Sequence, residues 1–288
     1  RRLGVLALLL LASVAAWWPG EWLAVARGSC DPAQLCAALL DVGQGDAIFI
    51  QSPVGTQMLI DGGRDSTVVR RLSAVMGLQD RTLDYLVATH PDLDHVSGLS
   101  DVLERYEVAH VIRTEKESET DAWRAVARGI AAEAATVSFA RRGQQFDLGG
   151  GTVVTVLFPE RDTGAFESNT ASIVLQLTHG THRFLLTGDA PKGIEEYLVL
   201  AEGEALQSDV LKVGHHGSRT STSELFLEHV RPRHAVISAG ADNRYGHPHV
   251  EVTDALFNAG ATVWNTATDG TVIFHSDGAQ LTAPSPTS

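Results

Sequence analysis

The sequence predicts one α/β domain, residues 36–278, in which two packed layers of β-sheet are covered by helices. Apolar runs of strand length gather toward both ends of this region, and segments with helical spacing lie between them. No linker divides the region, and no repeat of fixed period occurs in it. The chain of 288 residues is therefore expected to hold one large domain rather than two small ones.

Short apolar runs that end at glycine or aspartate predict the strands of the first half, and apolar residues three or four apart predict its helices. The expected strands are residues 35–42, 47–51, 57–60 and 83–89, followed by strands within 146–158. The expected helices are residues 68–76, 96–106 and 122–135, with a charged loop at 115–120.

The second half alternates strands and helices. Residues 172–177 and 183–187 are expected to form a hairpin that turns at His179-Gly180-Thr181. Further elements are expected as strands at 210–213, 235–238, 262–265 and 271–275, and as helices at 194–200, 223–229 and 251–259. Residues 279–288 are rich in proline, serine and threonine, which predicts a disordered tail.

Residues 1–26 contain an uncharged apolar run, residues 3–18, that follows two arginines and ends in two tryptophans. This pattern is typical of a transmembrane helix whose C-terminal end lies outside. A signal peptide cleaved at Ala24-Val25-Ala26 is the alternative, and a buried helix of a soluble protein is a third. The first two interpretations export the domain, after a linker at residues 27–35. Because the chain begins with arginine, we expect a processed product or a fragment.

Charge and cysteine content restrict the class of protein. The formal net charge is −13, with a pI near 5.3, which argues against a broad basic surface that coats DNA. It argues less against a metal-centred nuclease, because bound cations supply charge that the formal sum omits. The two cysteines, Cys30 and Cys36, are too few for a zinc ribbon held by thiolates. They are expected either to pair in an oxidising compartment or to remain free thiols.

The loop that begins at His90 carries four candidate metal ligands within six residues, directly after a predicted buried strand. In His90-Pro91-Asp92-Leu93-Asp94-His95, the spacing allows His90 and Asp92 to face one ion, and Asp94 and His95 to face another. Ligands on one short loop are brought together at low entropic cost. A charged surface loop is the alternative, but the flanking residues are apolar or glycine, which favours a metal site.

Three later strand ends carry further polar side chains. Asp189 follows an apolar strand, and it would either bridge two cations with its two oxygens or cap the next helix. His215 and His216 lie between glycines at the end of another predicted strand. His247 lies in a loop, where a lone histidine is more often structural than a ligand. Four such clusters in one domain predict a metal centre.

The motif His-x-Asp-x-Asp-His resembles the His-x-His-x-Asp-His signature of metallo-β-lactamase-fold hydrolases. Asp61-Gly62-Gly63, Gly188-Asp189 and the later histidine loops follow in the order expected for that family. The resemblance covers about residues 36–276, and it implies an αββα sandwich of the metallo-β-lactamase type.

More narrowly, residues 41–47, 211–218 and 244–249 resemble the C-terminal domain of ComEC-type competence proteins. Those are polytopic membrane proteins of bacterial DNA uptake, and their metallo-β-lactamase domain is thought to degrade the DNA strand that is not transported. On this resemblance, the apolar segment at the N-terminus would be the last transmembrane helix of such a protein.

The resemblance implies a centre with two divalent metal ions, Zn or Mn. Its implied metal ligands are His90 and Asp92 for the first ion, Asp94 and His95 for the second, Asp189 as a bridge, and His215 as the later histidine. Its implied catalytic residues are Asp94, Asp189 and His247. The expected substrate-binding residues are Lys212, His216, Ser218 and Arg244, and His216 would also support its neighbour.

Two departures from the family pattern affect the first metal site. Asp92 stands where many members have histidine, and Ser168-Asn169-Thr170 occupies the stretch in which a third histidine is usual. The loss of two imidazoles weakens this site, and carboxylate-rich sites suit Mn²⁺ or Mg²⁺ better than all-histidine sites do. We therefore expect Mn²⁺ as a rival to Zn²⁺.

These features together predict a metal-dependent nuclease that cleaves DNA phosphodiesters during uptake, since paired cations stabilise the charge that develops at phosphorus. It is expected at the inner or plasma membrane, with the catalytic domain on the extracytoplasmic side. The expected partners are single-stranded DNA, the membrane through the N-terminal segment, and the membrane channel part of the same parent protein. The alternatives are a secreted metallo-hydrolase of a small ester, lactam or phosphodiester, and a catalytically weak domain that binds DNA or gates a channel.

Overall fold

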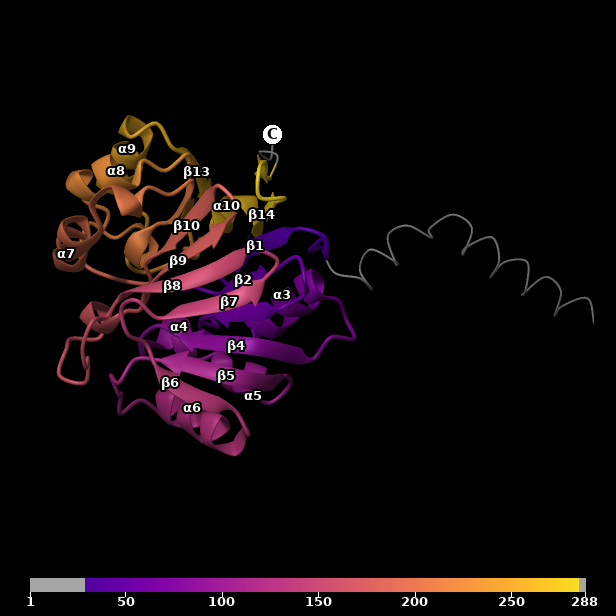
Figure 1. The fold of residues 1–288 in the computed structure, drawn as a ribbon. Coiled ribbons are helices and arrows are strands. Elements are labelled where there is room, and N and C mark those ends of the chain that lie inside the picture. Colours follow the sequence, from indigo (N-terminus) through magenta and orange to yellow (C-terminus); the bar gives the residue numbers. More distant parts are fainter. Residues whose placement is uncertain (1–28, 285–288) are drawn as a thin grey trace, which may run out of the picture.

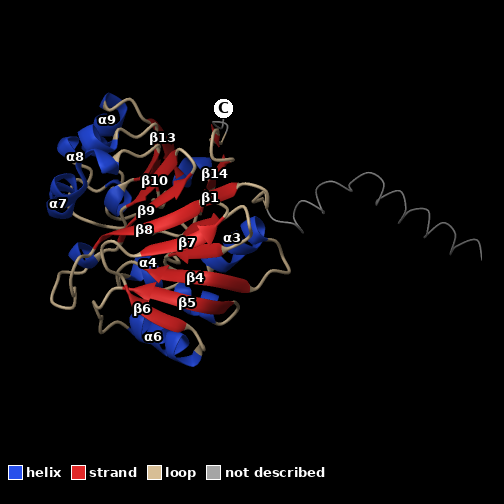
Figure 2. Cartoon of the chain, viewed as in Figure 1, coloured by secondary structure: helices blue, strands red, loops and turns tan. Residues whose placement is uncertain are grey.

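The computed structural model describes residues 29–284, in which two β-sheets face each other and helices cover both outer faces (Figures 1 and 2). The expected αββα sandwich is thereby confirmed. The apolar helix expected within residues 1–26 lies outside the described residues. Among the helices that are described, none has the length and apolar character needed to cross a membrane.

The first sheet contains eight strands in the order β15-β14-β1-β2-β3-β4-β5-β6. These strands are β1 (Leu35–Leu39), β2 (Ile48–Gln51), β3 (Gln57–Ile60), β4 (Thr82–Ala88), β5 (Glu107–Arg113), β6 (Thr136–Phe139), β14 (Val272–Ser276) and β15 (Leu281–Thr282). Its outer face packs against α3 (Thr67–Met76), α4 (Leu93–Val96), α5 (Leu99–Leu103) and α6 (Asp121–Ala132).

The second sheet contains seven strands in the order β13-β12-β11-β10-β9-β8-β7. These strands are β7 (Gln145–Gly149), β8 (Thr152–Phe158), β9 (Val174–His179), β10 (His182–Leu186), β11 (Val210–Lys212), β12 (His234–Ile237) and β13 (Thr262–Asn265). Its outer face packs against α7 (Lys192–Glu202), α8 (Glu224–Val230) and α9 (Val250–Asn258). Shorter helices are α10 (Thr266–Asp269), η1 (Asn169–Ala171), η2 (Gly203–Leu206) and η3 (Gly214–Gly217).

Side-chain alternation along the strands builds the two sides of each sheet. In β1, Leu35, Ala37 and Leu39 face the other sheet, whereas Cys36 and Ala38 face the helices. Between the sheets, the rings of Phe184 from β10 and Phe274 from β14 meet edge to face at 6.0 Å. The inter-sheet core thus joins segments from both halves of the chain into one domain.

Parallel strands deliver polar residues to one edge of each sheet. Strands β3, β4 and β5 run parallel in the first sheet, and β10, β11, β12 and β13 run parallel in the second. The loops that follow such strands leave from the same edge, where ligand sites of open α/β sheets form. The candidate metal ligands lie in these loops.

The sequence pattern does not predict β5 and β6. In β5, Val108 is separated from Val111 and Ile112 by the exposed residues Ala109 and His110, so the buried positions do not follow a simple alternation. In β6, Val137 and Phe139 are exposed because this strand forms the edge of the sheet. Tertiary pairing, rather than local pattern, makes these segments strands.

The helix expected at residues 96–106 is confirmed only over α5, because α4 ends at Val96 and Gly98 lies between the two short helices. A Cβ atom at Gly98 would lie 2.1 Å from the carbonyl oxygen of Gly62. The close approach of these two loops requires glycine at position 98. It also draws the histidine loop against the end of β3.

The described part of the expected tail contributes a strand rather than disorder. In β15, Leu281 pairs with Ser276 and Thr282 pairs with His275 of β14. Hydrogen bonding to the edge of the sheet outweighs the polar composition of these residues, which corrects the prediction for residues 279–284. Residues 285–288 lie outside the description.

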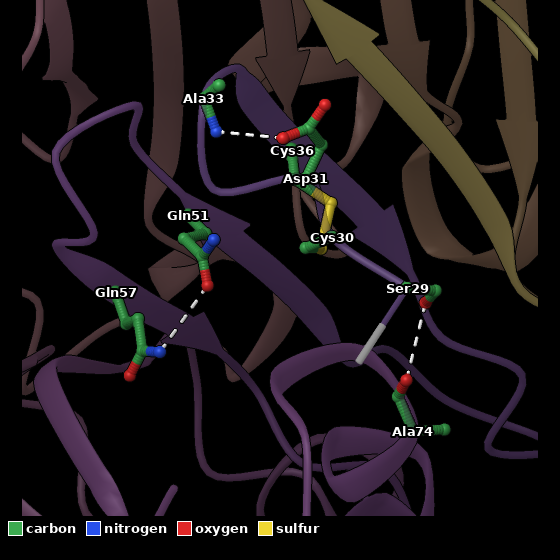
Figure 3. The surroundings of a disulfide bond; sticks show 8 residues. All are labelled: Ser29, Cys30, Asp31, Ala33, Cys36, Gln51, Gln57 and Ala74. Carbon is green, nitrogen blue, oxygen red and sulfur yellow. Dashed lines mark hydrogen bonds between the residues drawn. A yellow bond between two sulfur atoms is a disulfide. The ribbon is translucent and has the colours of Figure 1, made fainter. Parts of the chain in front are cut away.

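The segment before β1 is fixed by a disulfide bond between Cys30 and Cys36, whose Cα atoms lie 5.5 Å apart (Figure 3). The structure thus selects the paired alternative for the two cysteines. The backbone NH groups of Ser29 and Cys30 also donate to carbonyl oxygens of Ala74 and Val75 in α3. The sequence predicts a linker at residues 27–35, but residues 29–35 are attached to the first sheet and to helix α3.

We expect replacement of both Cys30 and Cys36 by alanine to lower the free energy of unfolding by about 2 kcal/mol, because a short closed loop no longer restricts the unfolded chain. Urea denaturation with and without dithiothreitol measures this effect. Dithiothreitol should destabilise the wild type by a similar amount and leave the double variant unchanged. Equal stability of the wild type in both conditions would contradict a stabilising role for the bond.

Candidate metal centre

Buried histidines and aspartates from both sheets meet at the edge where the parallel strands end. Asp46, His95, Asp189 and His216 are all buried, and each offers one donor atom within 4.8 Å of the others. His95 belongs to α4, His216 to η3, and Asp189 to the loop after β10. Segments far apart in the sequence thus place four donor atoms around one point.

The donor atoms at this point face one another. The Nε2 atom of His95 lies 3.2 Å from Oδ1 of Asp189 and 3.3 Å from Nε2 of His216. The Nε2 atom of His216 lies 3.5 Å from Oδ2 of Asp94 and 3.5 Å from Oδ2 of Asp189. Asp94 thus lies beside the same position, which Asp46, His95, Asp189 and His216 surround and which suits a cation.

A second group of donors lies around Oδ2 of Asp189. The Nε2 atom of His90 lies 3.7 Å from Oδ2 of Asp92 and 3.9 Å from Oδ2 of Asp189. Nε2 of His215 lies 3.7 Å from the same oxygen of Asp189. Asp189 therefore faces both groups. Helix α7 begins after Pro191, so Asp189 does not cap it.

Hydrogen bonds at the Nδ1 atoms fix the orientation of two imidazole rings. Nδ1 of His95 lies 2.8 Å from Oδ2 of Asp61, and Nδ1 of His216 lies 2.8 Å from the carbonyl oxygen of Ser238. A ring that donates from Nδ1 presents the lone pair of Nε2, which is the usual arrangement in metal-bound histidine. Asp61 in turn accepts hydrogen bonds from the backbone NH and the hydroxyl of Thr89.

His90 and Asp92 are also held by neighbouring hydroxyls. Nδ1 of His90 lies 3.0 Å from Oγ1 of Thr89 and 3.3 Å from Oγ of Ser172, while its buried Nε2 has no hydrogen-bond partner. Asp92 accepts a hydrogen bond of 2.6 Å from Ser168, in the stretch where the family histidine is missing. A hydroxyl contact to the carboxylate thus occupies part of that space.

The adjacent histidines occupy unequal positions. The His216 side chain is 1% exposed and lies in the centre, whereas His215 is 24% exposed and lies at the rim, 3.5 Å from Nδ2 of Asn169. The geometry therefore gives His216 the more central position, although we expected His215 to be the ligand and His216 its support. The backbone φ angles of 49° and 56° place both residues in the left-handed region, which costs about 1–2 kcal/mol per residue. Such strain is typical of functional sites.

Asp46 belongs to the centre, although sequence reasoning names it only within a motif and assigns it no role. Its Oδ1 is buried without a hydrogen-bond partner and lies 3.5 Å from Nδ1 of His216. The approach of its loop depends on Gly45, at φ +118°, where a Cβ atom would lie 1.8 Å from the carbonyl oxygen of Asp94. The signal available in the sequence is this glycine directly before the aspartate.

Lys212 does not reach the surface, so the structure corrects its expected role in phosphate binding. Its side chain is fully buried, forms an ion pair with Asp46, and donates a hydrogen bond of 2.9 Å to the carbonyl oxygen of Gly188. Its Nζ atom also lies 3.8 Å from Oδ1 of Asp189. Lys212 compensates buried negative charge instead.

The other expected substrate contacts lie around the rim or inside a loop. Ser218 is buried and accepts hydrogen bonds from Thr220, so its hydroxyl does not point to a substrate. The His247 ring lies 5.6 Å from that of His215, and its Nδ1 is buried without a partner. Arg244 is exposed on the same loop. Of these three residues, His247 and Arg244 have positions from which they could contact a substrate beside the centre, and Ser218 does not.

The electrostatics favour neutral histidine at one position and charged histidine at another. Burial, and after it His95, lowers the pKa of His90 to about 3. For His216, burial acts in the same direction, but Asp189 and Asp46 outweigh it and raise the pKa to about 9. For Asp46, burial raises the pKa, whereas Lys212 and His216 lower it, to about 2 overall. The centre therefore holds ionised carboxylates and protons that a cation would replace.

These donors fit a divalent metal ion. Three buried polar atoms lack a hydrogen-bond partner and lie in the centre: Oδ1 of Asp46, Nε2 of His90 and Oδ1 of Asp189. Buried polar atoms are normally paired, and buried charge is normally compensated or bound to metal. Mixed imidazole and carboxylate donors are the ligands that Zn²⁺ and Mn²⁺ accept.

The comparison with known sequences supports this assignment. The profile of the Metallo-beta-lactamase superfamily matches residues 40–241. ComE operon protein 3 of Bacillus subtilis is 31% identical over 251 residues, and Recombination protein 2 of Haemophilus influenzae is 32% identical over 237 residues; each match covers 81% of this chain. The chain spans about a third of the length of these relatives, 32% and 28%.

Solved structures share the fold. The metallo-beta-lactamase fold protein YhfI of Bacillus subtilis superimposes with a TM-score of 0.56 at 12% identity, covering 84% of this chain and 100% of that protein. CmlA, a diiron beta-hydroxylase from Streptomyces venezuelae, gives a TM-score of 0.56 at 15% identity, covering 85% of this chain and 55% of that one. At these identities the likeness extends to the architecture alone.

We expect metal binding at pH 7.5 to release at least one proton, because His216, with a pKa of about 9, is protonated in the metal-free protein and must lose that proton to bind metal. Affinity should therefore rise as the pH is raised from 7.5 toward 9, where His216 loses its proton. Calorimetric titration with Mn²⁺ in two buffers of different ionisation enthalpy counts the protons.

On binding Mn²⁺, the variant His216→Ala should release fewer protons than the wild type. The control variant His229→Ala, on the remote helix α8, should release the same number as the wild type. Mn²⁺ binding with the same heat in both buffers would show that no proton is displaced and would contradict this description of the centre.

Proposed function

The chain belongs to the metallo-β-lactamase superfamily of metal-dependent hydrolases, and we propose that it is a binuclear nuclease that cleaves DNA phosphodiesters. The observation that carries this proposal is the position of Asp189. Its Oδ1 faces His95 at 3.2 Å, and its Oδ2 faces His216 at 3.5 Å, His215 at 3.7 Å and His90 at 3.9 Å. One carboxylate between two groups of donors is the arrangement that a pair of cations requires.

In this proposal, two sets of residues hold the ions. The first set is His90, Asp92 and His215, the second is Asp94, His95 and His216, and Asp189 is shared by both. Two divalent cations bound there supply Lewis acidity toward a phosphoryl oxygen and a water molecule, which suits phosphodiester hydrolysis. The first set contains Asp92 and faces Asn169 rather than a third histidine, and this supports Mn²⁺ as well as Zn²⁺.

Three further side chains would act around these ions: Lys212 on the charge of the carboxylates, and His247 and Arg244 on the phosphate of the substrate. Lys212 is buried beside the carboxylates and compensates the negative charge of Asp46 and Asp189. Burial and the nearby His215 lower the pKa of His247 to about 4, so this ring is neutral at the rim and can hydrogen bond to a phosphate oxygen. Arg244 is exposed on the same loop and supplies a positive charge for phosphate.

Three observations support DNA on the outer side of a membrane. The relatives include proteins named for competence and recombination, among them Competence protein ComA of Neisseria gonorrhoeae at 29% identity. The bond between Cys30 and Cys36 is of a kind that persists in oxidising compartments. The apolar residues 3–18 offer an anchor in the inner membrane.

The proposed partners follow from this placement. They are single-stranded DNA, the membrane through the N-terminal segment, and a channel part of the same parent protein, since the relatives are about three times as long as this chain. The nuclease would then act on DNA at the extracytoplasmic face during uptake.

The full chain should hydrolyse single-stranded DNA when Mn²⁺ or Zn²⁺ is added, and Asp189→Asn should lower kcat at least about 100-fold, because the shared carboxylate is lost. Asp254→Asn, which changes an exposed carboxylate on α9, should leave kcat unchanged. Release of labelled fragments from a defined oligonucleotide measures both.

If the wild type and Asp189→Asn are equally inactive with Mn²⁺, Zn²⁺ and Mg²⁺ while both bind the oligonucleotide, the nuclease proposal fails. The chain would then be a domain that binds DNA without cleaving it.

A further inference from the structure

A cavity of about 420 Å³ opens beside the metal centre, and Arg244 is the one residue of its lining that the mechanism above uses. One wall is the loop before β2 together with Arg64, and the other is the loop that follows β12. Its lining consists of Gly43, Gln44, Arg64, Gly240, Ala241, Asp242, Asn243, Arg244 and Tyr245. The volume falls in the range of small-ligand sites, about 300–1,000 Å³.

Gln44 joins this cavity to the metal centre. Its Nε2 atom donates a hydrogen bond of 3.4 Å to Oδ2 of Asp94, and its Oε1 atom accepts one of 3.2 Å from the backbone NH of Gly240. The two loops approach so closely that a Cβ atom at Gly240 would lie 2.9 Å from the backbone nitrogen of Gln44. A ligand in the cavity would therefore be one side chain away from a proposed metal ligand.

Two arginines face the cavity without carboxylate partners. Within residues 29–284, neither Arg64 nor Arg244 forms a salt bridge, and both are exposed. The cavity lining includes one carboxylate, that of Asp242. In a chain with a net charge of −13, two guanidinium groups without carboxylate partners beside a cavity form a site that suits phosphate.

Tyr245 supplies an aromatic surface at the same place. Its ring is 47% exposed and stacks on the His247 ring, with centroids 5.5 Å apart and planes 23° apart. The guanidinium of Arg244 lies over the Tyr245 ring at 5.3 Å. A nucleobase that stacks on Tyr245 would displace this guanidinium toward a phosphate.

Asn243 keeps the loop in this shape. Its side-chain NH₂ group donates to the carbonyl oxygens of Gly240 and His247, and its side-chain oxygen accepts from the backbone NH groups of Tyr245 and His247. The aromatic ring and the rim histidine are thus held together by one amide. The cavity is therefore formed before a ligand arrives, which lowers the entropic cost of binding.

We propose that this cavity is a flanking-nucleotide pocket, in which a nucleotide next to the scissile phosphate stacks its base on Tyr245 while Arg64 and Arg244 hold the adjoining phosphate. This inference rests on the proposed nuclease function. It assigns a preference for single strands, because a base paired within a duplex does not offer a free face for stacking.

The base contact is tested without metal, in EDTA, on the full chain. Fluorescence anisotropy compares a labelled single-stranded 12-mer of ordinary nucleotides with an abasic strand of the same length. The wild type should bind the ordinary strand about tenfold more tightly, since stacking on one aromatic ring is worth about this much. Tyr245→Ala should abolish the preference and Tyr245→Phe should retain it, while Phe257→Ala, an exposed ring on α9, serves as the matched control.

The phosphate contacts are tested in the same assay at several salt concentrations. Arg64→Ala and Arg244→Ala should each weaken binding of both strands and reduce the slope of log affinity against log salt by about 1. The variant Arg70→Ala, an exposed arginine on α3, should leave that slope unchanged.

Two outcomes would overturn the proposal that a base stacks on Tyr245. One is equal binding of the ordinary and abasic strands by the wild type, and the other is a preference for the ordinary strand that survives in Tyr245→Ala. The result is independent of the nuclease proposal because no metal is present. A strand preference without Mn²⁺-dependent cleavage would refute the nuclease alone, and cleavage without the preference would refute the pocket alone.

Discussion

The structure depends on the burial of carboxylates between two sheets. Asp46, Asp61 and Asp189 are each at most 3% exposed, and burial of an ionised carboxylate is costly unless positive charge or hydrogen bonds compensate it. Asp61 is compensated by hydrogen bonds from Thr89 and His95. The other two have one oxygen each without a hydrogen-bond partner. Lys212 and protonated histidines compensate only part of this buried negative charge, and cations at the centre would compensate the rest.

The fold places the compensating groups beside these carboxylates because strand ends of both sheets meet at one edge. The first sheet contributes the loops after β1, β3 and β4, and the second contributes those after β10, β11 and β12. Left-handed backbone at Asp61, His215 and His216 turns side chains into the centre at a cost in local conformational energy. Packing between the sheets, where the Phe184 and Phe274 rings meet, supports this arrangement.

The sequence predicts what is local and misses what depends on tertiary contacts. The sandwich and the donor residues of the His90–His95 loop are predictable, because strand alternation and the spacing of donor residues are short-range properties. Which of two adjacent histidines lies deeper depends on the path of the chain after β11, and the burial of Lys212 depends on the tertiary contacts of β11 itself. The strands β5 and β6 escape prediction because pairing with neighbours, rather than their own apolar pattern, defines them.

We expect Asp189 to lie between two metal ions in the metal-loaded protein, and anomalous scattering from Mn²⁺ can locate these ions. Crystals of the protein grown with Mn²⁺ should give two anomalous peaks about 3.5–4 Å apart, one near His90 and one between His95 and His216. Anomalous maps without peaks in this region, with Lys212 still compensating Asp46 and with His95 and His216 still facing Asp189, would contradict the account.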